Sequence, residues 1–455
     1  MSFVPLSRLL AHGRPEEMVV CTDAAGPTRW REFAAAVGGI AGALAERSER
    51  RWLIHCEHPL EFAAALFAVL HAGCRAVVAP GLQPAMLAQL RPAYDAIVGT
   101  GSPVGLDVRG LARPGYRFAA IEPRSAWLDL FTSGSSGEPK RIEKSLAQLE
   151  TEGEVLEMTW GAALGSATMV ATVPHHHIYG LLFRLVWPLG AGRPFDAALC
   201  SDPQLLAGAL ARTGEAALVS TPAHLVRFPE LVPLESLGRG LKRIFSSGGP
   251  LPAATGVEYH RRLGRAPTEV YGSTESGGVG WREQDGSADC DAWRPFPRLA
   301  LRRESDGALS LRSPYLADES WLTMGDAIEL LPDGRFRLRG RLDRVVKIEG
   351  KRISLPEIEE ALRRDPRVAD AAVVPLPGSR ESLGAVVVAR DAVTEQGRRA
   401  LAAALREGLL ERFERVLVPR QFRFVSRLPA DERGKTTATQ LVALFARPDD
   451  DDPAA

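Results

Sequence analysis

The sequence predicts a large α/β domain at residues 1–340, followed by a small α+β domain at residues 344–455. Three observations support this prediction. The chain of 455 residues exceeds the size of one ordinary hydrophobic core. Short apolar runs alternate with amphipathic segments in the N-terminal part, which is typical of a sheet covered by helices. From about Gly340 the pattern changes to that of a small α+β unit.

Strands and helices alternate in the N-terminal part. Apolar residues recur every three or four positions from Trp30 to Leu44, the spacing of an amphipathic helix. Further strands and helices are expected at residues 18–21, 52–55, 60–71, 75–78, 83–90 and 96–99. Because strands joined through helices pair in parallel, we expect a parallel sheet covered by helices.

The C-terminal part is predicted to mix the two element types. Ser354 followed by Glu357 forms a capping-box pattern, which predicts a helix through Arg364. A longer helix is expected at residues 394–413, and strands at residues 368–374, 385–389 and 422–425. These elements are enough for one small domain.

The charge balance and the cysteines exclude several classes of protein. Lys plus Arg and Asp plus Glu are both 56, so the formal charge is zero and the pI is about 7.1. This balance argues against a nucleic-acid coat or a polybasic membrane anchor. The five cysteines form no CxxC pair, which leaves neither a disulfide framework nor a zinc cluster. No signal-peptide core or membrane-spanning run occurs, so we expect a cytoplasmic protein without a membrane span.

A loop rich in glycine and serine follows the apolar run at residues 128–131. It reads Thr-Ser-Gly-Ser-Ser-Gly-Glu-Pro-Lys at residues 132–140. The glycines permit close backbone approach, and the hydroxyls and the lysine add donors and positive charge, so this loop could wrap a polyphosphate. A flexible turn would have the same composition. A Walker P-loop is excluded because GxxxxGK[ST] does not occur.

Four further motifs follow the loop. They read Tyr-Gly-Ser-Thr-Glu at 271–275, Trp-Leu-Thr-Met-Gly-Asp at 321–326, Gly-Arg-Leu-Asp-Arg-Val-Val-Lys-Ile-Glu-Gly at 340–350, and Leu-Pro-Ala-Asp-Glu-Arg-Gly-Lys at 428–435. In this order, the motifs resemble the adenylate-forming superfamily of acyl- and aryl-CoA synthetases, luciferases and peptide-synthetase adenylation domains. The resemblance covers nearly the whole chain. It implies the adenylate-forming enzyme fold, with a hinge at Asp343 between the two domains.

The resemblance implies a reaction in two halves. A carboxylate attacks the α-phosphate of ATP and releases pyrophosphate, with Mg²⁺ as the metal, and a thiol then opens the acyl-adenylate. The thiol belongs to CoA or to the phosphopantetheine arm of an acyl carrier protein. The basic residues Arg344, Lys347, Lys351 and Arg352 suit either acceptor. The implied partners are a small carboxylic acid and, in the second case, the carrier protein, but no nucleic acid.

The resemblance also implies a role for each matched residue. Lys435 brings an ammonium to the reacting carboxylate, Thr274 reaches the α-phosphate and Glu275 holds Mg²⁺. The residues matched to ATP binding are Thr132, Ser133, Gly134, Ser135, Ser136, Gly137, Lys140, Tyr271, Gly272, Ser273, Asp326 and Arg341. Among them, Tyr271 lies on adenine, while Asp326, supported by Arg341, accepts both ribose hydroxyls. Without the resemblance, these would be ordinary turn, core or surface residues.

Three adjacent histidines stand in Pro-His-His-His-Ile-Tyr-Gly at residues 174–180. Neighbouring side chains point in different directions, so the three cannot easily chelate one metal ion. The segment instead resembles the family's P-x-x-H-x-x-G stretch, which implies that His177 lines the acid pocket. Gly248 and Gly249 match the family's glycine-rich turn at the pocket floor. The family's Phe-Asp pair for an α-amine is absent, and bulky residues near His177 favour an aryl or medium acyl acid.

Departures from the pattern leave alternatives open. Lys347 and Gly350 match the loop that meets the thiol, yet Arg344 replaces a second Asp there, and Met324 replaces a Thr before Gly-Asp. These departures put the substrate and the thiol acceptor in doubt. A catalytically idle nucleotide-binding relative, with a regulatory or scaffold role, is the alternative. The presence of Asp326 and Lys435 argues against it.

Overall fold

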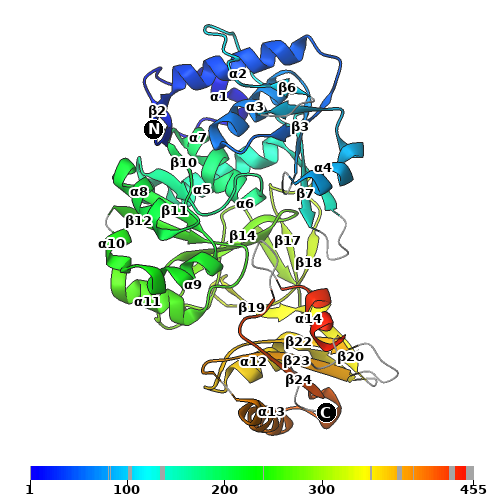
Figure 1. Cartoon of the computed structure of the whole chain (residues 1–455). Coiled ribbons are helices and arrows are strands. Elements are labelled where there is room, and N and C mark those ends of the chain that lie inside the picture. The colour runs from blue at the N-terminus through cyan, green and yellow to red at the C-terminus, as the bar shows by residue number, and fades with distance from the viewer. Residues whose placement is uncertain are drawn as a thin grey trace. The chain divides into compact units, whose positions relative to one another are not determined.

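The computed structural model describes residues 2–79, 81, 83–100, 105–133, 139–238, 240–348, 351–376, 382–392, 394–429 and 436–446 (Figure 1). Two compact units divide the chain. The first comprises Met1–Ala300, Leu311–Leu322 and Asp333–Arg335, and the second comprises Leu301–Ser310, Thr323–Pro332 and Phe336–Ala455. The chain therefore passes between the units several times before residue 340. The expected domain boundary at residues 340–344 stays a prediction.

The described part of the first unit contains two large sheets. The nine-stranded sheet has the order β15-β14-β13-β12-β11-β9-β10-β1-β2. Its strands are β1 (Val19–Asp23), β2 (Gly26–Arg29), β9 (Thr168–Ala171), β10 (Phe195–Leu199), β11 (Ala216–Ser220), β12 (Leu241–Ser246), β13 (Thr268–Ser273), β14 (Gly277–Glu283) and β15 (Arg294–Pro295). The pairs from β1 through β13 by way of β10, β9, β11 and β12 are parallel, whereas β1–β2, β13–β14 and β14–β15 are antiparallel.

The six-stranded sheet has the order β6-β5-β3-β4-β7-β8. Its strands are β3 (Arg51–His55), β4 (Arg75–Val78), β5 (Ala96–Gly99), β6 (Leu106–Asp107), β7 (Trp127–Ser133) and β8 (Pro139–Ser145). All pairs are parallel except β7–β8, which form a hairpin. The predicted parallel arrangement is thus confirmed for β3, β4 and β5. The first predicted strand, however, is β1 of the nine-stranded sheet, where β2 pairs with it in antiparallel orientation.

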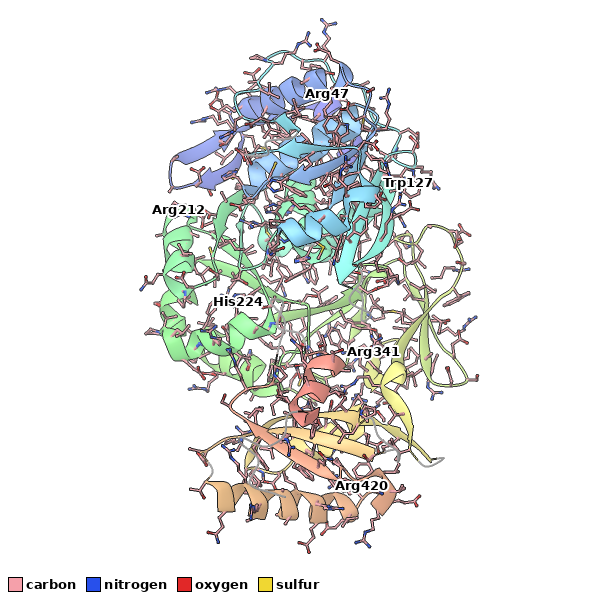
Figure 2. The ribbon with its side chains drawn as sticks, turned by 45° about the vertical axis from the view of Figure 1, so that its right-hand side comes forward. Arg47, Trp127, Arg212, His224, Arg341 and Arg420 are labelled. Carbon is pink, nitrogen blue, oxygen red and sulfur yellow. The ribbon has the colours of Figure 1, made fainter. Side chains whose placement is uncertain are left out.

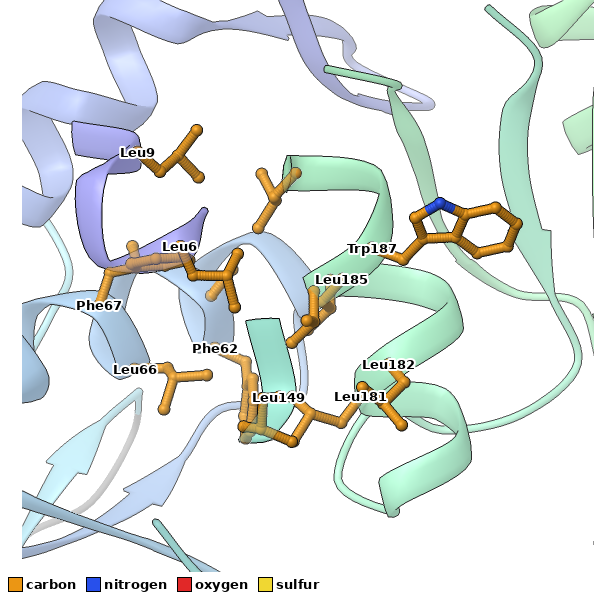
Figure 3. Packing of buried hydrophobic residues seen from close by; sticks show 14 of the residues in the cluster. Leu6, Leu9, Phe62, Leu66, Phe67, Leu149, Leu181, Leu182, Leu185 and Trp187 are labelled. Atoms are coloured by element: carbon orange, nitrogen blue, oxygen red, sulfur yellow. The ribbon is translucent and has the colours of Figure 1, made fainter. Parts of the chain in front are cut away.

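Helices separate these strands, and their buried faces form the core. They are α1 (Leu6–His12), α2 (Trp30–Ala45), α3 (Pro59–His71), α4 (Pro84–Gln89), α5 (Leu146–Leu164), α6 (Ile178–Gly180), the π-helix η2 (Leu181–Val186), α7 (Trp187–Ala191), α8 (Pro203–Thr213), α9 (Pro222–Leu231), α10 (Leu234–Gly238) and α11 (Ala253–Leu263). Figure 3 shows side chains of α1, α3, α5 and η2 meeting in one apolar cluster. Burial of this cluster stabilises the packing of these helices against one another.

The second unit holds most of a four-stranded sheet and the C-terminal elements. The sheet has the order β16 (Ala300–Arg303), β17 (Ala308–Arg312), β18 (Leu322–Leu330) and β19 (Phe336–Arg341). After it come the turn η3 (Leu342–Arg344), the hairpin β20 (Val345–Ile348) and β21 (Lys351–Ser354), the sheet of β22 (Val368–Leu376), β23 (Ser382–Ala389) and β24 (Gln421–Val425), and helices α12 (Leu355–Arg363), α13 (Glu395–Leu410) and α14 (Ala438–Ala446).

The expected C-terminal helices and strands are confirmed, but one detail is wrong. Ser354 is the N-cap residue of α12, yet its side chain makes no capping hydrogen bond. The cap of α13 is instead complete, because the Thr394 side chain accepts from Gly397 N. Among the described residues no helix combines the length and the apolar character needed to cross a membrane.

Candidate active site

The serine-glycine loop and the Tyr271 motif meet in the first unit through one ion pair. The register of β7 and β8 pairs Thr132 with Lys140 across the base of the loop. Lys140 Nζ lies 2.8 Å from Glu275 Oε1. Residues 134–138, which hold four of the predicted phosphate-binding residues, lie outside the described residues. The structure therefore brings together the base of the loop and the carboxylate predicted to hold Mg²⁺.

Glu275 lies in a tight turn between β13 and β14. Ser273 N donates to Ser276 Oγ at 3.0 Å, and Ser276 N donates to Ser273 Oγ at 3.1 Å. Gly277 takes a φ of +67°, a conformation that favours glycine. Burial tends to raise the pKa of Glu275, but the hydrogen bond and charge of Lys140, together with hydrogen bonds from the Glu275 backbone and Ser273, lower that pKa overall. Glu275 is therefore an anion at neutral pH.

The predicted metal ligand fits Mg²⁺ chemistry. Among the described residues no group of three or more His, Cys, Asp or Glu side chains is arranged around one ion position. The Glu275 side chain is 40% exposed and anionic, so it can supply one oxygen while nucleotide phosphates and water supply the others. Mg²⁺ is commonly bound in this way, by one or two carboxylates and substrate phosphates.

Tyr271 is backed by an aromatic and cationic stack that the sequence did not suggest. Its ring centroid lies 5.5 Å from that of Trp293, and the rings are tilted by 58°. The Arg282 guanidinium carbon lies 4.4 Å from the Trp293 ring centroid. Arg282 in turn donates to Glu269, a buried carboxylate of β13. Tyr271 is thus held by side chains of its own hairpin and of the segment after it.

The glycine-rich turn at residues 246–251 lies beside the Tyr271 strand. Ser247 Oγ donates to Val270 O at 2.8 Å, and Val270 directly precedes Tyr271. Gly248 has a φ of +91°, and a Cβ built there would meet no atom within 4 Å. The backbone therefore faces open space at this point, as a ligand cradle requires. The buried Ser246 Oγ has no hydrogen-bond partner among the described residues, so a bound acid could satisfy it.

His177 is half-buried and immediately precedes α6, with its ring centroid 4.6 Å from that of His176. Downstream, Phe183 of η2 lies 5.1 Å from Phe245 of β12, the strand that ends at the glycine-rich turn. Phe183 and Trp187 themselves are buried in the core. The Phe183 contact packs η2, which follows the histidine segment, against β12, while the position of His177 in an acid pocket stays a prediction.

Two other histidines lie among polar groups of the same unit. His175 is buried, its ring lies 4.6 Å from that of Phe62, and its Nε2 lies 3.1 Å from Cys56 O. Burial lowers the pKa of His175 to about 3. His224 of α9 (Figure 2) lies 3.0 Å from Thr221 Oγ1 and 3.3 Å from Thr172 Oγ1 through its Nδ1. Both rings are neutral, because burial also lowers the pKa of His224.

The predicted ribose-binding residues pair within the second unit. Asp326 of β18 and Arg341 of β19 (Arg341 is labelled in Figure 2) are register partners, and Arg341 Nη1 lies 3.6 Å from Asp326 Oδ2. Asp326 is 9% exposed. An acceptor-only carboxylate beside a guanidinium suits a sugar diol. The sequence motifs at residues 321–326 and 340–350 are thus brought together by a strand pair.

The remaining predicted residues belong to the second half of the chain. Asp343 lies in η3, between β19 and β20, and Lys347 lies on β20 opposite Arg352. Gly350 and Lys435 lie outside the described residues. Arg344 is bound to the buried Glu359 through hydrogen bonds of 3.0 and 2.6 Å. Its charge is therefore compensated within the second unit, and a contact of the basic residues near it with the thiol acceptor stays a prediction.

Comparisons with known proteins match both parts of the chain. A family model described as AMP-binding enzyme matches residues 107–299, and one described as AMP-binding enzyme C-terminal domain matches residues 357–435. The 4-coumarate–CoA ligase of Cereibacter sphaeroides is 31% identical over 312 residues, covering 67% of this chain and 68% of the relative. The fatty acid–[acyl-carrier-protein] ligase MmaC of Mycobacterium marinum is 26% identical, covering 95% of this chain and 96% of the relative.

Solved structures share the fold. The O-succinylbenzoate coenzyme A synthetase MenE from Bacillus subtilis, in complex with AMP, has a TM-score of 0.79 and 20% identity, covering 96% of this chain and 98% of that chain. The amide bond synthetase McbA from Marinactinospora thermotolerans also has a TM-score of 0.79, with 21% identity, covering 97% and 99%. At this identity the likeness concerns the fold alone.

Proposed function

The chain belongs to the adenylate-forming superfamily of AMP-binding enzymes, and we propose that it activates an aryl or medium-chain acid. As an AMP-forming acid–thiol ligase, it converts a carboxylic acid and ATP to an acyl-adenylate and pyrophosphate, and then transfers the acyl group to a thiol. The matched relatives are ligases, so the alternative of an idle nucleotide-binding relative gains no support from them.

The observation that carries the proposed site is the Lys140–Glu275 contact of 2.8 Å. It connects the two segments that the proposal assigns to phosphate and to Mg²⁺. With ATP and Mg²⁺ bound, Lys140 would contact the phosphates and Glu275 would hold the metal. Each side chain would thereby exchange the other, a partly solvated single charge, for a more highly charged group. Thr132, with the loop at residues 133–137, then surrounds the phosphates, while Thr274 reaches the α-phosphate.

The nucleoside is proposed to lie on Tyr271 and to be held through its ribose by Asp326 and Arg341. Tyr271 stacks on adenine, while Gly272 and Ser273 line the same strand end. Lys435 supplies positive charge to the reacting carboxylate and the α-phosphate, where charge shifts in the transition state. Mg²⁺ supplies neutralisation of the departing pyrophosphate.

The acid is proposed to lie between His177 and the turn of Gly248 and Gly249. The open space at Gly248 and the unpartnered Ser246 Oγ support a ligand there. The thiol is proposed to arrive at the loop of Lys347 and Gly350. CoA is the acceptor named for one relative and an acyl carrier protein for another, and either suits the proposal.

Acid-dependent exchange of labelled pyrophosphate into ATP tests the proposed substrate. Purified protein is incubated with ATP, Mg²⁺ and single acids that range from benzoates and cinnamates to long fatty acids. Exchange should be greatest with an aryl or medium-chain acid and absent when the acid is omitted. Greatest exchange with a C16 acid or an amino acid would reject the proposed acid class.

A further inference from the structure

A buried lysine that the proposed function does not use lies next to the site. Lys144, near the end of β8, is 2% exposed and is among the largest fully buried side chains of the described residues. Its Nζ donates to Glu275 O at 3.0 Å and to Tyr315 O at 3.1 Å. An ammonium is expensive to bury and is found inside a protein where it is bonded and compensated.

The compensating charge is Glu152 of α5, itself 4% exposed. Burial lowers the pKa of Lys144, and the carboxylates of Glu152 and Glu275 oppose that change. Burial likewise raises the pKa of Glu152, while Lys144 and the hydrogen bond from Gly278 N oppose it. Glu152 Oε1 accepts from Gly278 N at 2.6 Å. Lys144 and Glu152 therefore bond to opposite ends of one short turn, residues 275–278.

The turn fits closely against this network. A Cβ at Gly277 would lie 2.9 Å from Tyr315 Cδ2 and 3.0 Å from Glu152 Oε2. Gln148 Nε2 also donates to Tyr315 O, at 2.6 Å. The Tyr315 carbonyl therefore accepts two hydrogen bonds, from Lys144 and from Gln148, which fix its position. Because the turn is bonded at Glu275 O and Gly278 N and packed closely at Gly277, its backbone has little freedom.

Lys140 and Lys144 both donate hydrogen bonds to Glu275. They are four residues apart on β8, so their side chains leave the same face of the strand. Lys140 bonds the carboxylate of Glu275, and Lys144 bonds its carbonyl. The Lys140 ion pair with Glu275 is exposed, so phosphate and metal can replace its two partners. The Lys144 hydrogen bond to the Glu275 carbonyl is buried, so it stays in place when the ligands bind.

We propose that Lys144 is a positioning residue for adenylate formation, which fixes the backbone of Glu275 so that its carboxylate meets Mg²⁺ at the correct place. This inference rests on the proposed role of Glu275. A preorganised group reduces the reorganisation needed in the transition state. Loss of the Lys144 bond should then weaken the use of Mg²⁺ and slow adenylate formation, without affecting how the acid binds.

The test compares four variants with the wild type. Lys144→Met keeps the length of the side chain but removes its hydrogen-bond donors and its charge. Lys144→Arg keeps the donors and the charge. Lys144→Met/Glu152→Gln removes both charges, so no uncompensated carboxylate remains buried. Lys242→Met is the matched control, because Lys242 is 40% exposed and forms an ion pair with Glu215 at the surface. For each protein we would measure the melting temperature, and the exchange rate as a function of Mg²⁺, ATP and acid.

We expect Lys144→Met to lower the exchange kcat about 10-fold to 100-fold and to raise the Mg²⁺ concentration for half-maximal rate, with the KM for acid unchanged. Lys144→Arg should recover part of the rate. The double variant should recover the melting temperature but not the kcat or the Mg²⁺ dependence. Recovery of all three in the double variant would show a role in stability alone and would overturn the proposal.

Amide hydrogen exchange gives a reading that does not depend on activity. Exchange at residues 273–278 should be faster in Lys144→Met and in the double variant, and unchanged in Lys242→Met. Unchanged protection of that segment would overturn the proposal, whether or not the wild type forms an adenylate. If residues 273–278 exchange faster in Lys144→Met than in the wild type, but the wild type is inactive with every acid, the result would count against the proposed function only.

Discussion

At the scale of single residues, the buried indole of Trp293 supports the Tyr271 ring at the end of its strand. It lies between Tyr271 and Arg282, at 5.5 and 4.4 Å. Aromatic pairs contribute about 0.5 to 1.5 kcal/mol beyond their burial. If Tyr271 stacks on adenine, the loss of its support should weaken that stack by a similar amount.

Trp293→Leu should therefore raise the KM for ATP about 3-fold to 10-fold while leaving the KM for the acid within twofold. Trp293→Phe, which keeps an aromatic ring, should stay close to the wild type. The measurement is pyrophosphate exchange at varied ATP. Equal KM values for ATP in the wild type and in Trp293→Leu would count against a supporting role.

Neutral buried histidines should make stability depend on pH. His175 has its pKa lowered to about 3 and His71 to about 4, in both cases chiefly by burial. In the unfolded chain their pKa is about 6.5, so between these values the unfolded state binds more protons. The free energy of unfolding should then fall as the pH drops below about 6.5, by up to about 1.4 kcal/mol per pH unit for each histidine.

Replacing one histidine isolates its share. His175→Gln keeps a donor for Cys56 O but does not titrate, so the slope of unfolding free energy between pH 6 and 5 should decrease by close to one proton. Urea unfolding at several pH values measures this slope. A slope that the substitution leaves unchanged would mean that His175 is protonated in the folded protein.

At the scale of elements, the hairpin of β7 and β8 carries the loop, and Asp129 secures it. Asp129 is 1% exposed and accepts from Arg75 of β4 at 2.9 Å, while Arg141 of β8 lies 2.9 Å from its other oxygen. One carboxylate thus bonds across three adjacent strands. Its loss would leave the two guanidinium groups with only the half-exposed Glu143 as a carboxylate that both contact among the described residues.

Asp129→Asn should lower the free energy of unfolding by about 2 kcal/mol, because the arginines are only partly buried and recover some hydration. Urea unfolding would show this as a lower midpoint with an unchanged m-value. The KM for ATP should rise as well, since the loop strands lose their common anchor. If Asp129→Asn unfolds with the free energy of the wild type, the bonds of the two arginines to Asp129 would make no net contribution to stability.

The element predictions succeeded where a pattern has one interpretation. Periodicity placed α2, α3 and α13 within a few residues, and β4 and β5 lie where they were predicted. Periodicity carries no information on which strand pairs with which, so the division into two sheets was not foreseen. The burial of Lys144 was missed for a related reason, since a lysine in an isolated sequence is expected on the surface.

The site was predictable where backbone motifs carry it. Tyr271 and Glu275 share one hairpin, and Asp326 and Arg341 share one strand pair, so short-range structure brought each set together. The contribution of Trp293 depends on the path of the chain after β14, which no local motif specifies. The assignments of Gly134 and Lys435, outside the described residues, stay predictions.

At the scale of the whole molecule, both half-reactions must be served by one chain. Lys435 is assigned to the first half-reaction and the loop of Lys347 and Gly350 to the second. A movement on a few residues would present each in turn. Asp343, in a short turn between two strands, is the predicted pivot.

Asp343→Pro tests this pivot, because proline fixes φ near −65° and restricts the preceding residue. Pyrophosphate exchange should stay within about tenfold of the wild type, while thioester formation should fall far more. The two rates are measured on the same purified variant. Parallel changes in both would reject Asp343 as a hinge.

The central claim is that this chain joins an acid to AMP at the site of Lys140 and Glu275. The most direct measurement incubates the protein with ATP, Mg²⁺, an active acid and hydroxylamine, without any thiol, and quantifies nucleotides and hydroxamate. Hydroxylamine attacks the acyl-adenylate, so the account predicts AMP, pyrophosphate and acyl hydroxamate in equal amounts. ADP with phosphate in place of AMP, or AMP release that does not depend on the acid, would contradict it.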